Sequence, residues 1–592
     1  MPFIAGNKMN QTTVYKSVLS SVLFLTVCAG QCLAQISVRE NPSVRTTDRL
    51  NVDVTTGLPH WVIPDVGIGP DEIGLRHTVR SQQASFLMPR DDYRDSVILN
   101  QTGYACSIGW AGQSYLVSYN GLGECFYLQN GIFTSFDGKG SILEETQSEF
   151  LYTLSDGTEV TYSKVEGIYG FGLKRVRQPN GITTRVFYET NGSYRRVRSV
   201  EKNTGYRLYY KYGSDDPTQT DWQAFSGVIA YNAAAEACDS GVFCNFLQAW
   251  PSSSYVKTED STGITMAVID EAGQTTSFST DSSYQFNNYG RFNKVKLPFS
   301  NSPEIIYKYC PFDQSCTIWQ MTSSGVKYTT INDLVVSATQ NGLTWSYGLS
   351  SAGPVNLQRN STGPNGYVIN LLTQNNGNLI SLSTPKGGYT FSGGSGAQVR
   401  TATNADGSAA GYIRDGRGNI VEVRRGDAVE QRASFPVTCV NRITCNRPAS
   451  VTDANGNQTV FEYDPVHGGI VRATGPTLNG VTQETRYLYE ARFPRYLNGA
   501  GAVVQDPDPV WVLTQESSCR VGPSSATGCV LPEDEERTVY ERGPSHSTDG
   551  LLIRGIVKDA GGAVARTCYT YDRFGNQVSI TTPAAQLSTC SQ

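Results

Sequence analysis

Apolar and polar residues alternate along most of the chain, and glycine-containing turns interrupt the alternation at short intervals. Residues 182–188 (Ile-Thr-Thr-Arg-Val-Phe-Tyr) follow one Asn-Gly pair, and residues 457–463 (Asn-Gln-Thr-Val-Phe-Glu-Tyr) follow another. A period of two with β-branched and aromatic side chains predicts β-strands. No segment shows a convincing amphipathic helix, and the nearest to one, residues 224–238, is weak.

The pairs Asn-Gly and Asp-Gly recur through the chain, and they predict tight turns between the strands. Asn and Asp tolerate a positive φ and Gly adopts it readily, which is what a two-residue type I′ hairpin turn requires. We therefore predict an all-β fold made of repeated β-hairpins. The pairs begin at Asn120, Asn130, Asp137, Asp156, Asn180, Asn191, Asn341, Asn365, Asn376, Asp406, Asp415, Asn455, Asn479, Asn498 and Asp549.

The composition agrees with a folded, β-rich protein. Among 592 residues there are 59 glycines and 33 tyrosines, and only 17% of residues are charged, the reverse of a disordered chain. The glycines keep no period of three, which excludes collagen. The net charge of −5 gives no electrostatic reason to expect nucleic acid as a partner.

The N-terminus has the organisation of a secretory signal peptide. Two lysines precede an apolar run at residues 18–30, and a small-residue site ends at Ala34. The run is shorter than the roughly 20 residues that span a bilayer, so residues 1–34 are predicted to be a cleaved signal peptide. A lipid anchor at Cys28 is only weakly supported. No later run approaches 18 apolar residues, so we expect a secreted, periplasmic or cell-surface protein with no transmembrane segment after cleavage.

Twelve of the 14 cysteines follow the predicted cleavage site, and they occur as close neighbours in sequence. Zinc sites favour Cys-x2–4-Cys spacing with a second pair or a histidine nearby, and none of the four histidines stands beside a pair. Local disulfides in an oxidising compartment fit this spacing better. Each would close a short loop and add about 2 kcal/mol to the free energy of unfolding. Free buried thiols are the alternative. The candidate pairs are Cys106 with Cys125, Cys238 with Cys244, Cys310 with Cys316, Cys439 with Cys445, Cys519 with Cys529, and Cys568 with Cys590.

One repeated motif is clear near the C-terminus. Residues 571–583 begin Tyr-Asp-Arg-Phe-Gly: Tyr571 ends a strand, Asp572 can accept backbone hydrogen bonds in the turn, and Gly575 supplies a positive φ. Residues 451–464 contain the complementary half, Val-Thr-Asp-Ala-Asn-Gly-Asn-Gln-Thr-Val-Phe-Glu, and end in Tyr463 and Asp464.

These motifs resemble the unit of the Rhs/YD-repeat family, Tyr-Asp-x-x-Gly followed by Asp-x-x-Gly-x-x-Thr-x-apolar-x-Tyr. Residues 52–57, 63–66 and 74–81 are similar to the segment that opens such proteins. The resemblance implies an extended spiralling sheet or partial β-shell. It divides the mature chain into an N-terminal β-rich segment, residues 35–170, and a degenerate repeat region, residues 171–592.

Toxins of this family carry a self-cleaving motif and an effector after the repeats. Neither follows Pro583, so the sequence is predicted to be a truncated or cargo-less member. The residues Asp506-Pro507-Asp508-Pro509 resemble acid-proline pairs of the self-cleaving region, but their context favours a loop. A spiral that stops after strand 577–581 leaves an edge that either docks a second polypeptide or is blunted by a disulfide between Cys568 and Cys590.

No catalytic, cofactor-binding or metal-binding motif is present, so we expect no enzymatic activity and no cofactor. Residues 453–457 place Asp and Asn as in a calcium loop, but Gly456 is out of register and no bidentate Glu follows, which favours a hairpin turn. Residues 206–212 place Tyr206, Leu208, Tyr210 and Tyr212 on one strand face. That strip either packs inside the sheet, the commoner use, or binds glycans.

The predicted function is therefore that of an exported scaffold or partial shell, which encapsulates or presents a polypeptide cargo or joins another Rhs/YD chain. The alternative is a cell-surface protein that binds glycans or another cell.

Overall fold

A computed structural model describes residues 46–80, 90–94, 96–101, 113–135, 140–164, 171–192, 194–281, 292–298, 304–309, 317–322, 325–330, 334–351, 356–374, 379–391, 399–478, 480–520, 522–525 and 528–590. The predicted signal peptide, residues 1–34, lies outside these residues. So do Cys106, Cys310 and Cys316, which leaves two of the candidate disulfides undescribed.

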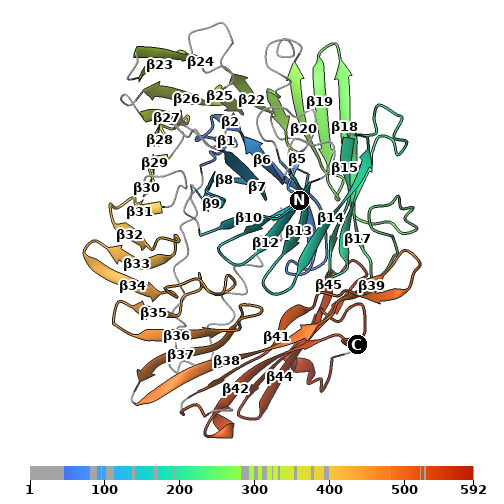
Figure 1. The fold of residues 1–592 in the computed structure, drawn as a ribbon, viewed down its shortest axis with the longest axis vertical. Helices are drawn as coiled ribbons and strands as arrows, with labels where there is room; N and C mark the ends of the chain where they lie inside the picture. The colour runs from blue at the N-terminus through green and yellow to red at the C-terminus, as the bar shows by residue number, and fades with distance from the viewer. Residues whose placement is uncertain are drawn as a thin grey trace, which may run out of the picture.

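One antiparallel sheet of 36 strands dominates the molecule and curves around it as a ring (Figure 1). Its strands follow chain order, because each hairpin pairs with the next: β10 to β22, then β25 to β38, then β41 to β45. The predicted all-β class, with repeated hairpins in an extended sheet, is confirmed. The division of the chain at residue 170 remains a prediction, and β12 pairs with β13 across it.

The first part of the ring holds 13 strands in chain order. They are β10 (Ile142–Glu145), β11 (Glu149–Thr153), β12 (Glu159–Lys164), β13 (Phe171–Arg177), β14 (Thr183–Asn191), β15 (Tyr194–Lys202), β16 (Tyr206–Tyr212), β17 (Phe225–Asn232), β18 (Ser252–Asp260), β19 (Gly263–Ile269), β20 (Thr275–Asp281), β21 (Lys294–Lys296) and β22 (Ile305–Tyr309).

The second part begins after a separate ribbon, β23 (Thr317–Thr322) with β24 (Gly325–Thr330). Its strands are β25 (Val335–Gln340), β26 (Leu343–Ser351), β27 (Asn356–Thr362), β28 (Val368–Gln374), β29 (Leu379–Thr384), β30 (Gly387–Phe391), β31 (Val399–Asn404), β32 (Ala409–Arg414), β33 (Ile420–Arg425), β34 (Ala428–Ser434), β35 (Ser450–Asp453), β36 (Gln458–Tyr463), β37 (Ile470–Leu478) and β38 (Val481–Arg492).

The last part of the ring follows a second ribbon, β39 (Arg495–Leu497) with β40 (Val503–Gln505). Its strands are β41 (Val510–Cys519), β42 (Glu535–Arg542), β43 (Ile553–Ala560), β44 (Ala563–Tyr571) and β45 (Gln577–Thr581), with short 3-10 helices at η1 (Pro532–Asp534) and η2 (Pro583–Ala585). The described residues contain no α-helix, and residues 224–238 include strand β17. No helix among them is long and apolar enough to cross a membrane.

Four further strands branch from β13 toward the centre of the ring: β6 (Val97–Gln101), β7 (Ser114–Tyr119), β8 (Leu122–Gln129) and β9 (Ile132–Ser135). Since β9 also lies against β10, these strands and β10 to β13 enclose one part of the first buried cluster. Phe126, Phe150 and Tyr162 are fully buried in it.

The inner segment, residues 46–80, lies inside the ring (Figure 1). It contains β1 (Val52–Asp53), β2 (Leu58–Pro59), β3 (Val62–Ile68) and β4 (Leu75–Arg80), and β4 pairs with β5 (Arg90–Asp91). Its apolar residues belong to all three buried clusters of the protein: Ile68 to the first, Val52 to the second and Val54 to the third. The inner segment therefore fills part of the concave side of the sheet and ties distant repeats together.

The end of the sheet returns to its beginning, and the two meet along a seam between residues 180–250 and residues 494–576 (Figure 1). Trp511 N donates to Asn180 O at 2.7 Å, and Leu497 N donates to Ala233 O at 2.8 Å. Phe574 packs edge-on against Trp250, with ring centroids 5.4 Å apart. One full circuit of repeats thus closes by side-chain and backbone contacts across the seam.

The predicted type I′ geometry is correct for only some turns. Both residues have positive φ at Asn120-Gly121, Asn130-Gly131 and Asn341-Gly342. Elsewhere a single glycine has positive φ, as at Gly456 and Gly575, and the turn is one residue longer. The aspartate that opens such a turn accepts hydrogen bonds from backbone N–H groups and so stabilises a loop of three residues. The Asn-Gly or Asp-Gly pair alone predicted a loop of two residues.

Candidate functional site

A buried charged cluster joins the inner segment to the outer sheet. His77 of β4 is 0% exposed and lies between two carboxylates: its Nδ1 is 2.7 Å from Asp65 Oδ1, and its Nε2 is 3.8 Å from Asp91 Oδ2. Tyr255 of β18 donates to Asp65, and Tyr210 of β16 donates to Asp91 at 3.1 Å. The inner segment supplies His77 and Asp65, β5 supplies Asp91, and the outer strands supply hydroxyl groups, so the cluster joins the inner strands to the outer sheet.

The charges in this cluster stabilise one another. Burial alone would lower the pKa of His77, but the charges and hydrogen bonds of Asp65 and Asp91 raise it to about 10. Burial alone would raise the pKa of each carboxyl, but the hydrogen bond and charge of His77 hold both below their ordinary value. The sequence offered no partner pattern for His77, because Asp65 and Asp91 lie 12 and 14 residues away and the fold alone brings them together.

The aromatic strip of residues 206–212 is a packing element. Tyr206, Leu208 and Tyr210 are buried, and so are Arg207 and Tyr209 on the opposite face of β16. The inner segment covers one face through β4, and residues 238–246 cover the other, where Phe246 packs against Tyr209 at 5.4 Å. The hypothesis that this strip binds glycans is therefore wrong.

The repeat-motif residues shape turns and hold strands. Asp572 accepts from Phe574 N and Asn576 N, both at 2.9 Å, and Tyr571 donates to Ile553 O at 2.9 Å. Gly575 packs over the Tyr206 ring, where any side chain would collide with the phenol. The final repeat turn is therefore part of the seam.

The other half of the motif behaves in the same way. Tyr463 donates to Pro448 O at 3.0 Å, and Asp464 accepts from Val466 N at 2.7 Å. In the candidate calcium loop, Asp453 accepts from Asn455 N at 2.9 Å and from Asn457 N at 2.8 Å, so its carboxylate organises a hairpin turn.

Asp506-Pro507-Asp508-Pro509 lies in a loop after β40, as its sequence context favours. Asp506 is fully buried and accepts from Arg185 of β14 at 2.8 and 3.2 Å and from Tyr496 at 3.0 Å. Asp508 also contacts Arg185, at 2.7 Å. These residues clamp the seam.

Four candidate cysteine pairs come together in the structure as disulfides. Their Cα atoms lie within the range that a disulfide spans. The Cα separations are 6.0 Å for Cys238 and Cys244, 4.9 Å for Cys439 and Cys445, 5.6 Å for Cys519 and Cys529, and 5.4 Å for Cys568 and Cys590.

The other two candidate pairs stay predictions. Cys125 lies on β8 and is disulfide-bonded, but Cys106, its expected partner, lies outside the described residues. Cys310 and Cys316 both lie outside them.

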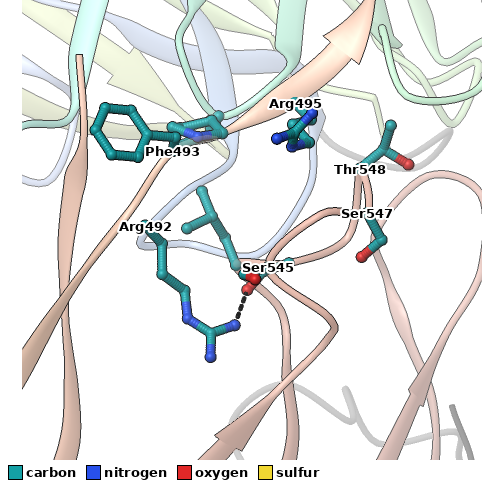
Figure 2. A pocket seen from close by; sticks show the side chains of 10 residues that line it. Arg492, Phe493, Arg495, Ser545, Ser547 and Thr548 are labelled. Carbon is teal, nitrogen blue, oxygen red and sulfur yellow. Dashed lines mark hydrogen bonds between the residues drawn. The ribbon is translucent and has the colours of Figure 1, made fainter. Parts of the chain in front are cut away.

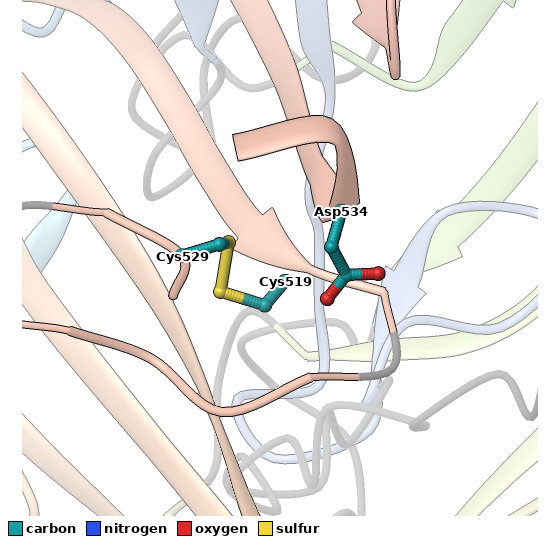
Figure 3. Close-up of side chains that lie close together, drawn as sticks. All are labelled: Cys519, Cys529 and Asp534. Atoms are coloured by element: carbon teal, nitrogen blue, oxygen red, sulfur yellow. A yellow bond between two sulfur atoms is a disulfide. The ribbon is translucent and has the colours of Figure 1, made fainter. Parts of the chain in front are cut away.

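Asp534 lies beside the disulfide of Cys519 and Cys529 (Figure 3). Three such side chains can form a metal site when the cysteines are thiolates. Here the two sulfurs are bonded to each other and offer no thiolate to a metal, so this group is a structural crosslink with a neighbouring carboxylate.

Non-reducing peptide mapping of the exported protein is expected to recover the four local pairs that the structure describes. Trypsin can cut between the cysteines of three of these pairs, at Arg442, Arg520 and Arg573, so each of these disulfides should be recovered as two linked peptides. Free thiols at these positions, or pairs that join different repeats, would contradict the local assignment.

A groove of about 970 Å³ lies beside residues 47–50. Aromatic and amide side chains line it, among them Trp345, Tyr367, Tyr389, Asn341 and Asn365. A smaller pocket beside the seam, lined by Arg492, Ser545 and Ser547 among others, has room for about one water, 10 Å³ (Figure 2). Arg492 there donates to the backbone carbonyls of Gly543 and Gly550, both at 2.7 Å. Of these two hollows, the groove has the volume of a ligand site.

No protein-family model and no curated protein matches the chain. Solved structures of TcdB2-TccC3 are similar to it at 10% identity and a TM-score of 0.26, over 84% of this chain and 28% of that chain. The structure of TcdB2-TccC3 without the hypervariable C-terminal region is similar at 11% identity and a TM-score of 0.25, over 96% of this chain and 29% of that chain. The structure of TcdB2-TccC3-Cdc42 is similar at 11% identity and a TM-score of 0.24, over 84% of this chain and 27% of that chain. The chain spans less than a third of the length of each of these chains.

Proposed function

We propose that the chain is an exported, non-enzymatic scaffold of the Rhs/YD type, in which strand β45 accepts a strand from a second polypeptide. The sequence motifs support the family, and the signal peptide supports export. The inner segment lies on the concave side of the sheet, which favours presentation of a polypeptide over its encapsulation in this part of the chain.

Strand β45 carries the proposal. In the part of the chain that the structure describes, β45 pairs in register with one strand, β44. Its sequence, Gln-Val-Ser-Ile-Thr, has no charge and no proline, and Val578 and Ile580 are 61% and 56% exposed. Natural edge strands are usually protected by charges, prolines or bulges. Strand β45 has a register shift at Val578 but neither a charge nor a proline, and an edge without charge or proline is suited to strand addition. The disulfide between Cys568 and Cys590 fixes the tail to β44, the neighbouring strand.

Strand addition can be tested with a synthetic peptide of residues 563–581, a hairpin of the chain's own repeat type. We expect the peptide to bind the purified chain and to slow hydrogen exchange in β45, because new inter-strand bonds would form there. The double lysine variant, which combines Val578→Lys with Ile580→Lys, should lose this binding. Val460→Lys, an exposed valine on β36 with strand neighbours on both sides, is the matched control and should bind like the wild type.

Light scattering on the isolated chain reports whether a second copy takes the same place. Self-association that the double lysine variant abolishes supports an open edge. A monodisperse monomer whose β45 amides are already protected, and which does not bind the peptide, contradicts the proposal. Export is tested separately by mass spectrometry, where the mature protein should begin at Gln35.

The groove beside residues 47–50 favours one second function, glycan binding. Aromatic rings and amide side chains together suit sugar rings and hydroxyl groups. A glycan array should then give a ligand that Tyr389→Ala no longer binds. Tyr194→Ala, which alters an exposed tyrosine outside the groove, should still bind it.

A further inference from the structure

His467 is a neutral histidine enclosed in the turn between β36 and β37. It is 5% exposed, and its ring lies 4.8 Å from Trp511 of β41 in a stacked arrangement and 4.5 Å from Tyr489 of β38. Its Nδ1 accepts a hydrogen bond from Gly469 N at 3.1 Å. An acceptor nitrogen carries no proton, so this bond exists only in the neutral form of the ring.

The charged and titratable groups around His467 come from three elements. Asp464 of the same turn has Oδ1 3.5 Å from His467 Nε2 and favours protonation. Burial of the ring opposes protonation, and so does the positive charge of Arg447, from the loop before β35. Tyr489 faces the ring and carries no charge at neutral pH. Burial contributes most, and the pKa of His467 is lowered from its ordinary value near 6.5.

A second loop rests directly on this turn. The bridging loop, residues 441–447, is closed by the disulfide between Cys439 and Cys445. Asn441 Nδ2 donates to Pro465 O at 2.8 Å, and Ile443 and Arg447 pack so closely over Gly468 that a side chain there would collide with them. The conformation of the turn therefore supports the position of the loop.

The same loop also contacts the strands that begin the ring. Arg442 donates to Glu144 of β10 through both terminal nitrogens, at 2.5 and 2.7 Å. Asn446 Nδ2 donates to Ser155 O, after β11, at 3.1 Å. The chain of contacts thus runs from His467 through the bridging loop to β10 and β11.

We propose that His467 is a pH-sensitive latch, whose protonation releases the bridging loop from β10 and β11. In the protonated ring, Nδ1–H faces Gly469 N–H, so two donors oppose each other and the turn must rearrange. Because the native state disfavours the proton, the stability contributed by this turn is complete above about pH 6.5. It falls as the pH drops from there toward the lowered pKa of the folded state.

Hydrogen exchange of the full chain at pH 7 and pH 5, corrected for the intrinsic rate, tests the latch. At pH 5 we expect faster exchange in residues 441–447 and 142–155, by about tenfold for each unit of pKa depression. His467→Asn places its Oδ1 at the position of Nδ1, where it can accept from Gly469 N–H, but it does not titrate, so it should lose the difference. His546→Asn, at an exposed histidine, is the matched control and should keep it.

A second readout does not depend on any variant. Exchange of the imidazole C2 hydrogen, followed by mass spectrometry, reports the pKa of His467 in the wild-type chain, which should lie below 6.5. The proposal is overturned by a pKa at or above 6.5, by equal corrected exchange at the two pH values, or by the same acid response in His467→Asn.

Discussion

Replacing His77 with alanine is expected to destabilise the fold by about 3–5 kcal/mol, the range for removing one partner of a buried ion pair. The substitution leaves Asp65 and Asp91 facing each other without the cation between them, and both are nearly inaccessible to water. Urea unfolding followed by tryptophan fluorescence measures the effect, because Trp61 belongs to a buried cluster that the inner segment completes. His546→Ala, at an exposed histidine, should unfold like the wild type.

The same cluster predicts a pH dependence whose sign is fixed by the pKa of His77. The folded pKa of about 10 is above the unfolded value near 6.5, so the stability from His77 is complete below 6.5 and is lost as the pH rises through 10. Asp65 and Asp91 act in the opposite direction. Their lowered pKa values make a contribution that is present above about pH 4 and is lost in stronger acid. A wild-type chain whose stability is flat between pH 7 and 10 would contradict this account of the cluster.

Replacing Asp506 with asparagine is expected to cost about 3 kcal/mol, at the low end of the same range, because Arg185 keeps Asp508 as a partner. The loss should be local to the seam, since the clamp joins β14 to the loop after β40. Hydrogen exchange in residues 180–190 and 494–511 provides the measurement.

Asp508→Asn is the matched control for that substitution, because Asp508 is half-buried and makes a single contact with Arg185. Its effect should be clearly smaller than that of Asp506→Asn. Equal effects of the two variants, or none from either, would show that the seam does not depend on the buried carboxylate.

Much of the local structure could be predicted from the sequence. The expected strands at residues 206–212 and 577–581 coincide with β16 and β45, and those at 182–188 and 457–463 overlap β14 and β36 closely. Alternation of side chains is a local property, so it identifies strands without knowledge of their partners. The turn types were predicted less well, because an Asn-Gly pair does not reveal whether the preceding aspartate or asparagine adds a residue to the loop.

The tertiary features could not be predicted, because each depends on residues far apart in the chain. Trp61 donates to Tyr307 across 246 residues, and Arg185 meets Asp506 across 321. A strip such as residues 206–212 has the same pattern whether one face or both are covered. Only the fold shows that the inner segment covers one face and residues 238–246 the other. The same reason explains why His467 had no recognisable partners in the sequence.

The central claim is that residues 46–80 form an integral inner layer that braces a ring-shaped scaffold. Hydrogen exchange of the full chain at pH 7 tests it most directly. We expect the amides of β3 and β4 to be as strongly protected as those of β16 to β19, because these strands share buried clusters and the His77 site. Exchange of β3 and β4 within seconds, while β16 to β19 stay protected, would show that the inner segment is a detachable tail and that the ring stands without it.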